Sequence, residues 1–451
     1  MGTIFSSGDI AAVTCYRASF AHLAGASQRR NDVNGAAISP ACVSIVKIMP
    51  DTATAVENVM DLERQYLLQN YARYPLVLHK GKGSWVYDAE GRRYLDLITG
   101  IGVNALGHAH PRIVRAIREQ AALIIHSSNL YYNEFQGPLA KRLCGISGLD
   151  RAFFCNSGTE AMELAIKMMH SHGRKAGEGK SEIISLENSF HGRSMGALSI
   201  TGQAKYRDPF APLMPAVRFI PPNDISALEQ AVGPQTAGIV MEWIQGEGGI
   251  YPIDPAFATR ARELATQHDA LLVFDEIQCG VGRTGRYFAY QLSDPLVKPD
   301  ITVTAKPLAC GIPLGAVIVN ERAAASIGPG MHGTTFGGGP LACRVALEFL
   351  DILDGLLPSI HRLGGEMRAH LTEMARTHSI IRDVRGFGLM IGIELDIPGR
   401  QIVLDAMEAG LLINCTHNTV IRLLPPYNIS EREVDRALSI LSKVLKNAKT
   451  A

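Results

Sequence analysis

Two short apolar runs in this chain end in residues of opposite charge, and they constrain the fold more than any other feature. Leu271 to Phe274 lead into Asp275, and Ile301 to Ala305 lead into Lys306. Short runs of β-branched and apolar residues are typical of buried strands. In one parallel sheet the two charged residues would emerge at the same edge, which is where open α/β sheets bind their ligands. We therefore expect an α/β fold with chemistry at that edge.

Lys306 has two interpretations. A buried ammonium is costly unless it is paired or neutralised, so this lysine either extends into solvent or is an amine with a lowered pKa. An amine of the second kind forms a Schiff base with pyridoxal phosphate. Asp275 favours that interpretation, because the pyridinium nitrogen of the cofactor needs a fixed anion to stay protonated. An acid at a strand end is otherwise a cap or turn residue.

A third apolar run, residues 153–155, breaks into a glycine-containing turn that opens a helix. Four apolar residues recur there at helical spacing: Met162, Ala165, Ile166 and Met169. One face of this helix is therefore expected to be buried. Its first turn presents free N–H groups and the positive end of the helix dipole, which is typical of a phosphate site. The alternative is simple capping by Ser157 or Thr159.

Six motifs, in this order, resemble the class III pyridoxal-phosphate aminotransferases, and within them the acetylornithine branch. They are NSGTE at 156–160, FHGR at 190–193, EWIQGEGG at 242–249, DEIQ at 275–278, AK at 305–306 and HGTTFGG at 332–338. The resemblance runs from about Glu57 to the C-terminus. It implies fold type I, the aspartate-aminotransferase type, with a large, mostly parallel sheet and a small α/β domain.

The resemblance also implies how the cofactor is held. Lys306 is expected to carry it covalently and to move protons as general base and acid, and Asp275 to pair with its ring nitrogen. These two are the predicted catalytic residues. The predicted cofactor contacts are Lys306, Ser157, Gly158, Thr159, Phe190, Asp275, Gln278 and Thr335, of which Phe190 packs on the ring, Gln278 reaches the ring hydroxyl and Thr335 comes from a partner chain.

Five residues are expected to bind substrate, again by resemblance. Arg193 takes a carboxylate, Tyr71 helps to hold it, and Thr334 reaches across a dimer interface. Glu247 is expected to pair with Arg385 as a gate that is closed over a diamine and open for a dicarboxylate. From the residues alone, Arg193 is a surface residue and Tyr71 a partly buried anchor.

The expected reaction moves the terminal amino group of N-acetylornithine to 2-oxoglutarate, giving N-acetylglutamate semialdehyde and glutamate, as in arginine biosynthesis. Other ω-amine transaminases, acting on ornithine, succinylornithine, 4-aminobutyrate or a carrier-bound lysine precursor, share the cofactor residues. A nicotinamide-dependent oxidoreductase is disfavoured: the Gly-x-Gly-x-x-Gly run at 280–285 follows a strand, but helical apolar spacing does not follow it. The chain departs from the family at Trp243, Gly339 and Phe387.

Length and composition limit the remaining possibilities. The 451 residues, 47% of them hydrophobic, are enough for two domains. We expect residues 1–56 to be an N-terminal extension without fixed structure, 57–110 plus 346–451 a small domain, and 111–345 a large cofactor-binding domain. A net charge of +1 favours neither nucleic acid nor a membrane surface as a partner.

Eight cysteines without a Cys-x-x-Cys pair indicate reduced thiols in the cytoplasm. No apolar run reaches the ~18 residues of a membrane span. His108 and His110 lack a third ligand at metal-binding spacing, so no metal is expected. The partners implied are an amino donor, 2-oxoglutarate and a second copy of the chain, in a homodimer with shared active sites.

Overall fold

The computed structural model describes residues 52–448, so the predictions for the first 51 residues lie outside the described range. Within it, the chain from Val59 onward forms one compact unit. Helix α1 spans Thr52–Tyr66. The division of the chain into a large and a small domain stays a prediction.

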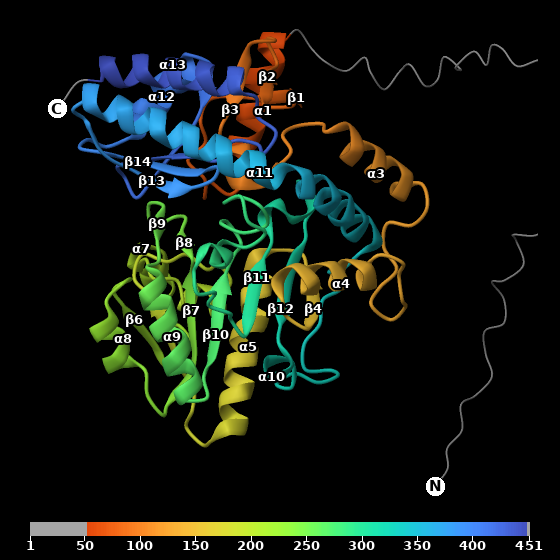
Figure 1. Ribbon diagram of the computed structural model, residues 1–451. Coiled ribbons are helices and arrows are strands. Elements are labelled where there is room, and N and C mark those ends of the chain that lie inside the picture. Colours follow the sequence, from red (N-terminus) through yellow and green to blue (C-terminus); the bar gives the residue numbers. More distant parts are fainter. Residues whose placement is uncertain (1–51, 449–451) are drawn as a thin grey trace, which may run out of the picture. The chain divides into compact units, whose positions relative to one another are not determined.

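A seven-stranded sheet forms the centre of the fold and confirms the α/β class (Figure 1). Its strands, in spatial order, are β4 (Arg151–Cys155), β12 (Gly315–Val319), β11 (Ile301–Thr304), β10 (Leu271–Asp275), β7 (Thr236–Glu242), β5 (Glu182–Leu186) and β6 (Val217–Ile220). Only β12 runs antiparallel to its neighbours. The predicted strands before Asp275 and Lys306 are direct parallel neighbours, with Asp275 opposite Val303.

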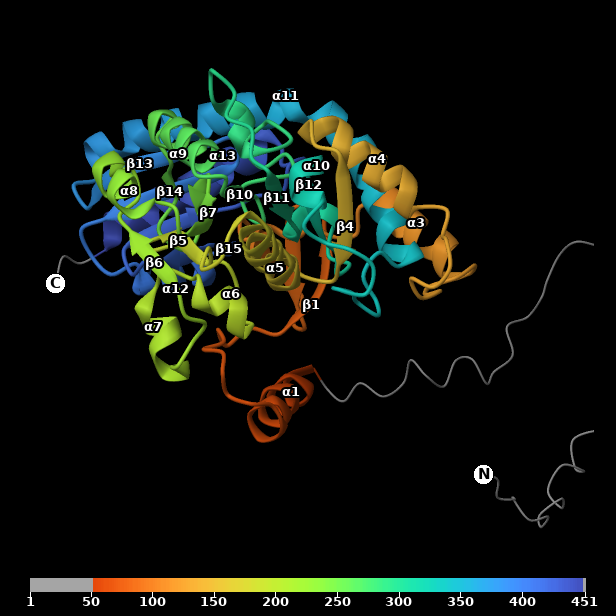
Figure 2. The ribbon, with the colours of Figure 1, turned by 90° about the horizontal axis from the view of Figure 1, so that it is seen from below.

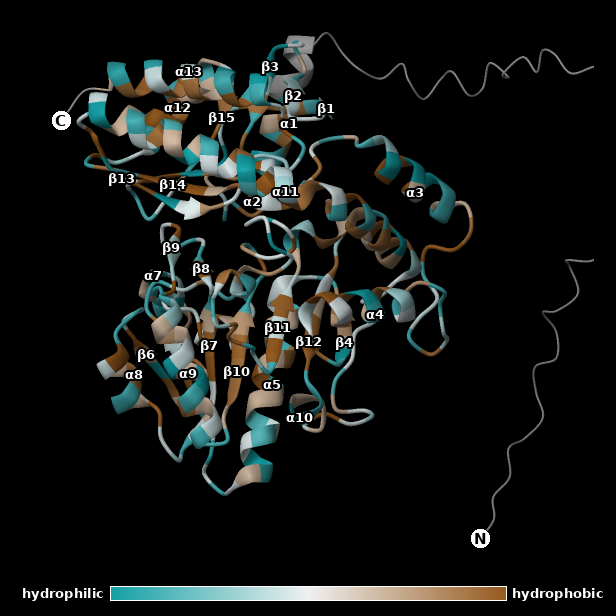
Figure 3. Ribbon diagram, in the orientation of Figure 1, coloured by the Kyte–Doolittle hydropathy of each residue, from teal (hydrophilic) through white to brown (hydrophobic). Residues whose placement is uncertain are grey.

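Alternate residues of the central strands face opposite layers of the core. On β10, Leu272 and Phe274 pack in one layer together with α9 (Pro255–Gln267) and α4 (Gln136–Ser147). Leu271 and Val273 pack in the other layer with α5 (Gly158–Ala176). Side chains alternate across a strand, so helices cover both faces and every residue of β10 is buried. Figures 1 and 2 show α9 and α5 on opposite sides of the sheet, and Figure 3 shows its hydrophobic central strands.

Both ends of the described chain contribute to one smaller sheet. Its order is β1 (Leu78–Lys82), β2 (Trp85–Asp88), β3 (Arg93–Asp96) and β15 (Leu411–Leu412), with β15 parallel to β3. Strands β2 and β3 pair antiparallel as a hairpin. A further sheet consists of β13 (Ile381–Phe387), β14 (Met390–Leu395), β17 (Val420–Leu423) and β16 (Asn414–Thr416).

Helix α11 runs for 38 residues, Pro340–Thr377, and joins the central sheet to the C-terminal sheet. It contacts α3 (Pro111–Ala121), α4, β13 and α13 (Glu431–Asn447). The predicted domain boundary at 345/346 therefore falls inside a continuous helix. The remaining elements are α2 (Thr99–Gly102), α6 (Met195–Ser199), α7 (Ala204–Arg207), α8 (Ile225–Ala231), β8 (Ile244–Gln245), β9 (Tyr251–Pro252), α10 (Glu321–Ala324) and α12 (Arg400–Glu408). None of the helices in the described part of the chain is both long enough and apolar enough to span a membrane.

Candidate active site

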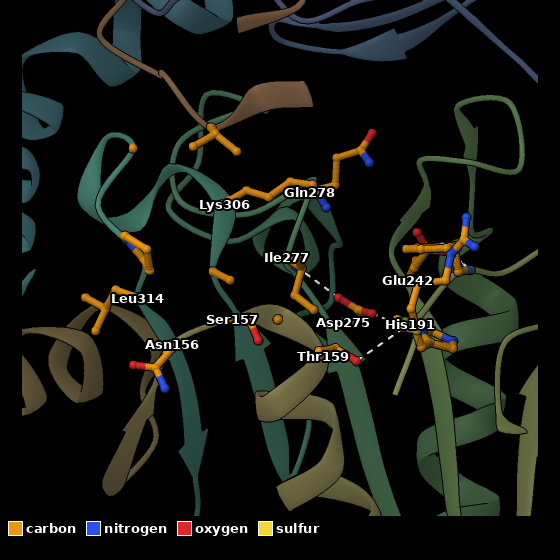
Figure 4. A pocket seen from close by; sticks show the side chains of 18 of the residues that line it. Asn156, Ser157, Thr159, His191, Glu242, Asp275, Ile277, Gln278, Lys306 and Leu314 are labelled. Carbon is orange, nitrogen blue, oxygen red and sulfur yellow. Dashed lines mark hydrogen bonds and ion pairs between the residues drawn. The ribbon is translucent and has the colours of Figure 1, made fainter. Parts of the chain in front are cut away.

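A cavity of about 440 Å³ opens at the carboxyl edge of the central sheet. Its lining comes from the last residues of β7 and β10, from the segments that follow β4, β5, β10 and β11, and from Val103. Asp275 and Lys306 both line this one cavity (Figure 4). The other predicted residues in the lining are Ser157, Gly158, Thr159, Phe190, Arg193 and Gln278. The parallel strands thus bring together predicted residues that are far apart in sequence, from Ser157 to Lys306.

Asp275 is a buried carboxylate held by two donors. Its Oδ2 lies 2.7 Å from Nδ1 of His191, and its Oδ1 accepts a hydrogen bond of 3.0 Å from the Ile277 N–H. Both oxygens are therefore fixed, and the carboxylate presents a defined direction to the cavity. Such a group is suited to hold a cationic ring nitrogen.

His191 was not among the predicted site residues, although its motif was recognised. It follows β5 and reaches Asp275 at the end of β10, although β7 lies between these strands in the sheet. A pairing across an intervening strand depends on the course of the loop after β5, which no local pattern reveals. The only sequence feature that could have indicated His191 is its place in the FHGR motif, directly after Phe190.

Lys306 begins a short 3₁₀ turn directly after β11 and is partly buried at the cavity wall. Burial lowers the pKa of Lys306, since the charged ammonium loses hydration, while the nearby carboxylates of Asp275 and Glu247 oppose this shift. A neutral amine is nucleophilic, whereas an ammonium is not. The surroundings therefore match the second interpretation of this lysine.

The N-terminus of α5 forms another wall. Ser157 caps the helix, with its Oγ accepting from the Glu160 N–H at 3.3 Å. Thr159 Oγ1 accepts from the N–H groups of Arg193 and Ser194 at 3.3 and 3.2 Å. The first N–H groups of a helix have no partner within it, so capping by Ser157 leaves donors for an anion. The two interpretations of this turn are compatible.

Gly158 leaves no room for a side chain at this wall. A Cβ at that position would come within 2.7 Å of Ile277 Cδ1, and Ile277 also lines the cavity. The missing side chain brings the helix backbone close to the cavity. This is the kind of cradle that a phosphate group requires.

Arg193 is an exposed guanidinium at the cavity, supported by aromatic rings. It lies 4.2 Å from the centre of the Tyr206 ring and 5.5 Å from that of Phe190, and these two rings meet edge to face at 5.8 Å. Among the ion pairs within residues 52–448, none includes Arg193. It is therefore free to bind an incoming carboxylate with two parallel hydrogen bonds.

The predicted pairing of Glu247 with Arg385 is wrong. Glu247 Oε1 instead accepts from Nη1 of Arg422, at 2.5 Å, and Arg422 is 1% exposed. Arg385 binds Glu394 at 2.6 Å and Asp383 at 2.9 Å, and it lies over the Tyr251 ring. Arg385 and Arg422 lie on strands of the same sheet, and the sequence motifs did not show which of the two would meet Glu247. The signal was Arg422 itself, a charged residue inside the apolar strand 420–423, where an unpaired guanidinium would be costly.

Five predicted residues do not line the cavity: Glu247 and Arg385, described above, and Tyr71, Thr334 and Thr335. Tyr71 is 68% exposed, and Thr335 is also exposed. Thr334 Oγ1 accepts from Asn156 Nδ2 at 3.1 Å. The roles given to Thr334 and Thr335 involve a partner chain, and they stay predictions, as does that of Tyr71.

The departures from the family lie outside the cavity lining. Trp243 is buried against Phe274 in the core, and Gly339 precedes α11 as its N-cap. Phe387 is partly exposed, and its ring centre lies 6.0 Å from the Arg368 guanidinium.

Residues 280–285 form consecutive turns rather than a strand-to-helix loop, which agrees with the rejection of a nicotinamide site.

Residues 66–445 match the family "Aminotransferase class-III". The chain therefore belongs to the class III aminotransferases, which are pyridoxal-phosphate-dependent enzymes of fold type I, as predicted. It is 46% identical to an acetylornithine aminotransferase of Methanocaldococcus jannaschii over 396 residues, covering 87% of this chain and 99% of the relative. An acetylornithine aminotransferase of Aquifex aeolicus is 44% identical over 381 residues, covering 84% and 100%.

Solved structures agree with this membership. The ornithine aminotransferase from Toxoplasma gondii aligns with a TM-score of 0.83 and 33% identity, covering 90% of this chain and 97% of that one. The N-acetylornithine aminotransferase from Stenotrophomonas maltophilia aligns with a TM-score of 0.74 and 35% identity, covering 86% and 98%.

Proposed function

We propose that this protein transfers the terminal amino group of N-acetylornithine to 2-oxoglutarate, giving N-acetylglutamate semialdehyde and glutamate. The observation that carries the choice of donor is the similarity, at 42% to 46% identity, to eight acetylornithine aminotransferases. The geometry of the cavity supports the reaction class. Other terminal amines, such as ornithine, are the alternative donors.

The residues of the cavity fit pyridoxal phosphate. The start of α5 with Gly158 suits the anionic tail, the fixed Asp275 carboxylate suits the ring nitrogen, and Lys306 supplies the amine. Phe190 and Gln278 also line the cavity, where they would contact the ring and its hydroxyl. When bound, this cofactor supplies an electron sink for a broken C–H bond.

The chain itself moves the proton. Nζ of Lys306, which burial makes easier to deprotonate, is the base that takes a proton from the substrate carbon and the acid that returns it. Asp275 keeps its negative charge in place, oriented by His191 and the Ile277 N–H. Because these donors are already ordered, the carboxylate need not reorient during the reaction.

Substrate carboxylates go to the two arginines of the site. Arg193 takes the carboxylate of either substrate, since it stands at the cavity with its guanidinium unpaired within the described residues. Glu247 neutralises Arg422 while the amino donor is bound. For 2-oxoglutarate, withdrawal of Glu247 releases Arg422 for the second carboxylate.

We also propose a homodimer whose active sites are completed by both chains. Support comes from large apolar side chains that are exposed on a single chain near the 334–337 loop. They are Leu123, Ile124, Ile125, Leu130, Tyr131, Tyr132 and Phe336. Asn129 ties the two segments together through the Thr334 and Gly337 carbonyls, at 3.2 and 3.0 Å. An exposed patch of this kind marks a protein interface.

A cytoplasmic location is part of the same proposal. All six cysteines within the described residues have free thiols. Free thiols persist in a reducing compartment, where disulfides are rare.

Steady-state kinetics on the purified holoenzyme test the proposed donor. N-acetylornithine, ornithine and 4-aminobutyrate are compared, each with 2-oxoglutarate, and glutamate formation is measured. The proposal predicts that kcat/KM for N-acetylornithine exceeds the other values by about tenfold or more, since the site must recognise the acyl group. A higher kcat/KM for ornithine or 4-aminobutyrate would reject this donor.

A further inference from the structure

The guanidinium of Arg422 binds three further groups in addition to the carboxylate of Glu247. Besides Glu247, its Nη1 donates to Gln278 Oε1 at 3.0 Å and to the Gly246 carbonyl at 3.4 Å. Its Nε donates to Asn414 Oδ1 at 3.2 Å. Asn414 thus holds the opposite side of the guanidinium from Glu247.

Asn414 reaches Arg422 through the register of the sheet. Strands β16 and β17 are antiparallel, and Asn414 lies directly opposite Arg422. Residues two apart on a strand face the same side, which brings Thr416 to the gate as well. Thr416 Oγ1 donates to the Glu247 carbonyl at 2.7 Å, so β16 anchors both members of the pair.

When the Glu247 carboxylate moves away from Arg422, the free-energy cost of keeping the guanidinium ordered depends on Asn414. A buried guanidinium that loses its carboxylate needs its other hydrogen bonds to stay in place. The hydrogen bonds to Asn414 and Gln278 keep the Arg422 side chain in the same orientation after the Glu247 carboxylate has moved away. A substrate carboxylate then finds a guanidinium that is already oriented, which avoids the ordering cost of binding.

We propose that Asn414 is a positioning residue for the acceptor substrate: it holds Arg422 in place for the second carboxylate when Glu247 withdraws. The proposal rests on the proposed function in assigning that carboxylate to Arg422. It predicts that loss of the Asn414 side chain weakens the binding of dicarboxylates and leaves the binding of the amino donor unchanged. The amino donor is spared, because Arg422 stays paired with Glu247 while the donor is bound.

The first test is a split between the two substrates of the holoenzyme. Asn414→Ala should raise KM for 2-oxoglutarate about tenfold, the scale of one hydrogen bond to a charged group. KM for the amino donor and kcat should change less than about twofold. Asn414→Val, which suits a strand and also lacks an acceptor, should give the same split.

The matched control is Cys415→Ala. Cys415 lies between Asn414 and Thr416 on β16 but faces away from the gate, with its Sγ 3.1 Å from the Asn418 carbonyl. This variant should keep both KM values. Equal increases of both KM values in the Asn414 variants, or an unchanged KM for 2-oxoglutarate, would overturn the proposal.

Direct binding separates this inference from the choice of donor. Glutarate has two carboxylates and no reactive carbonyl, so its affinity for the holoenzyme is measurable by calorimetry without turnover. The affinity should fall about tenfold in Asn414→Ala and stay constant in Cys415→Ala. If N-acetylornithine is not a substrate but glutarate binding falls as stated, the proposed donor fails and the role of Asn414 stands. Unchanged glutarate binding rejects that role whatever the donor.

Discussion

Nδ1 of His191 lies 2.7 Å from Oδ2 of Asp275, and both side chains are buried. The contact joins the loop after β5 to the end of β10, with β7 between the two strands. It therefore fixes the carboxylate through a part of the fold that is remote in sequence. The affinity for the cofactor depends on this contact if Asp275 holds the ring nitrogen.

Removal of the imidazole should weaken cofactor binding. In His191→Ala, Asp275 loses a buried partner worth about 1.5–3 kcal/mol, which corresponds to a tenfold or larger rise in Kd for pyridoxal phosphate. Titration of the apoenzyme, followed by absorbance, measures this change. His79→Ala alters an exposed histidine on β1 and should leave Kd unchanged. Equal affinities of the wild type and His191→Ala would show that the contact is not needed.

The cradle at α5 has an equally direct test. A methyl group in Gly158→Ala would meet Ile277 Cδ1 at 2.7 Å, so the helix start or Ile277 must shift. We expect Kd for pyridoxal phosphate to rise about tenfold, because displaced N–H groups bind the phosphate less well. Gly145→Ala in α4 meets no atom within 4 Å and is the control. Its cofactor affinity should match the wild type, with a small gain in stability.

Arg193 should matter for both substrates. Arg193→Gln removes a charged hydrogen-bonding partner and should raise KM for the amino donor and for 2-oxoglutarate by about tenfold to a hundredfold. Lys205→Gln is the matched control. Lys205 also lies over the Tyr206 ring, at 4.9 Å, but it does not line the cavity. If the KM values rise equally in both variants, the effect comes from the lost contact with the Tyr206 ring and not from lost carboxylate binding.

Glu276, next to Asp275, predicts a pH dependence of stability. Burial raises the pKa of Glu276 from 4.5 to about 7, although the Ala289 and Tyr290 N–H groups oppose this shift. The folded protein therefore binds more protons than the unfolded chain between these values. The contribution of Glu276 to the free energy of unfolding is complete below pH 4.5 and is lost as the pH rises through 7. The loss is on the order of 3 kcal/mol.

Urea denaturation of the apoprotein at pH 5 and pH 8 measures this effect. Glu276→Gln removes the titration, so the stability of the variant relative to the wild type should improve between pH 5 and pH 8. A constant difference between the two proteins at both pH values would contradict the raised pKa of Glu276.

Sequence patterns predicted the α/β class and one edge of the site, whereas the fold type was implied by the family resemblance. The run before Asp275 is short and apolar, and the run before Lys306 is short and mostly β-branched; such runs are typical of strands buried on both faces of a parallel sheet. The four apolar residues at helical spacing likewise identified the buried face of α5. These features depend on local periodicity, which a sequence displays directly.

Patterns did not reveal which charged groups meet across the fold. Arg422 and Arg385 lie on strands of one sheet. Asn414, directly opposite Arg422, and Glu394, on the strand next to Arg385, bind the two guanidinium groups. His191 meets Asp275 only because the loop after β5 crosses the end of β7. Such contacts arise from tertiary packing, and no spacing along the chain encodes them.

The central claim is that Lys306 carries the cofactor in the cavity that it shares with Asp275. Borohydride reduction of the holoenzyme, followed by proteolysis and mass spectrometry, tests it most directly, because reduction fixes the cofactor on its lysine. We predict the phosphopyridoxyl mass on the peptide that contains Lys306 and its absence in Lys306→Ala. A label on a different lysine, or an unlabelled wild-type protein with full activity, would contradict the claim.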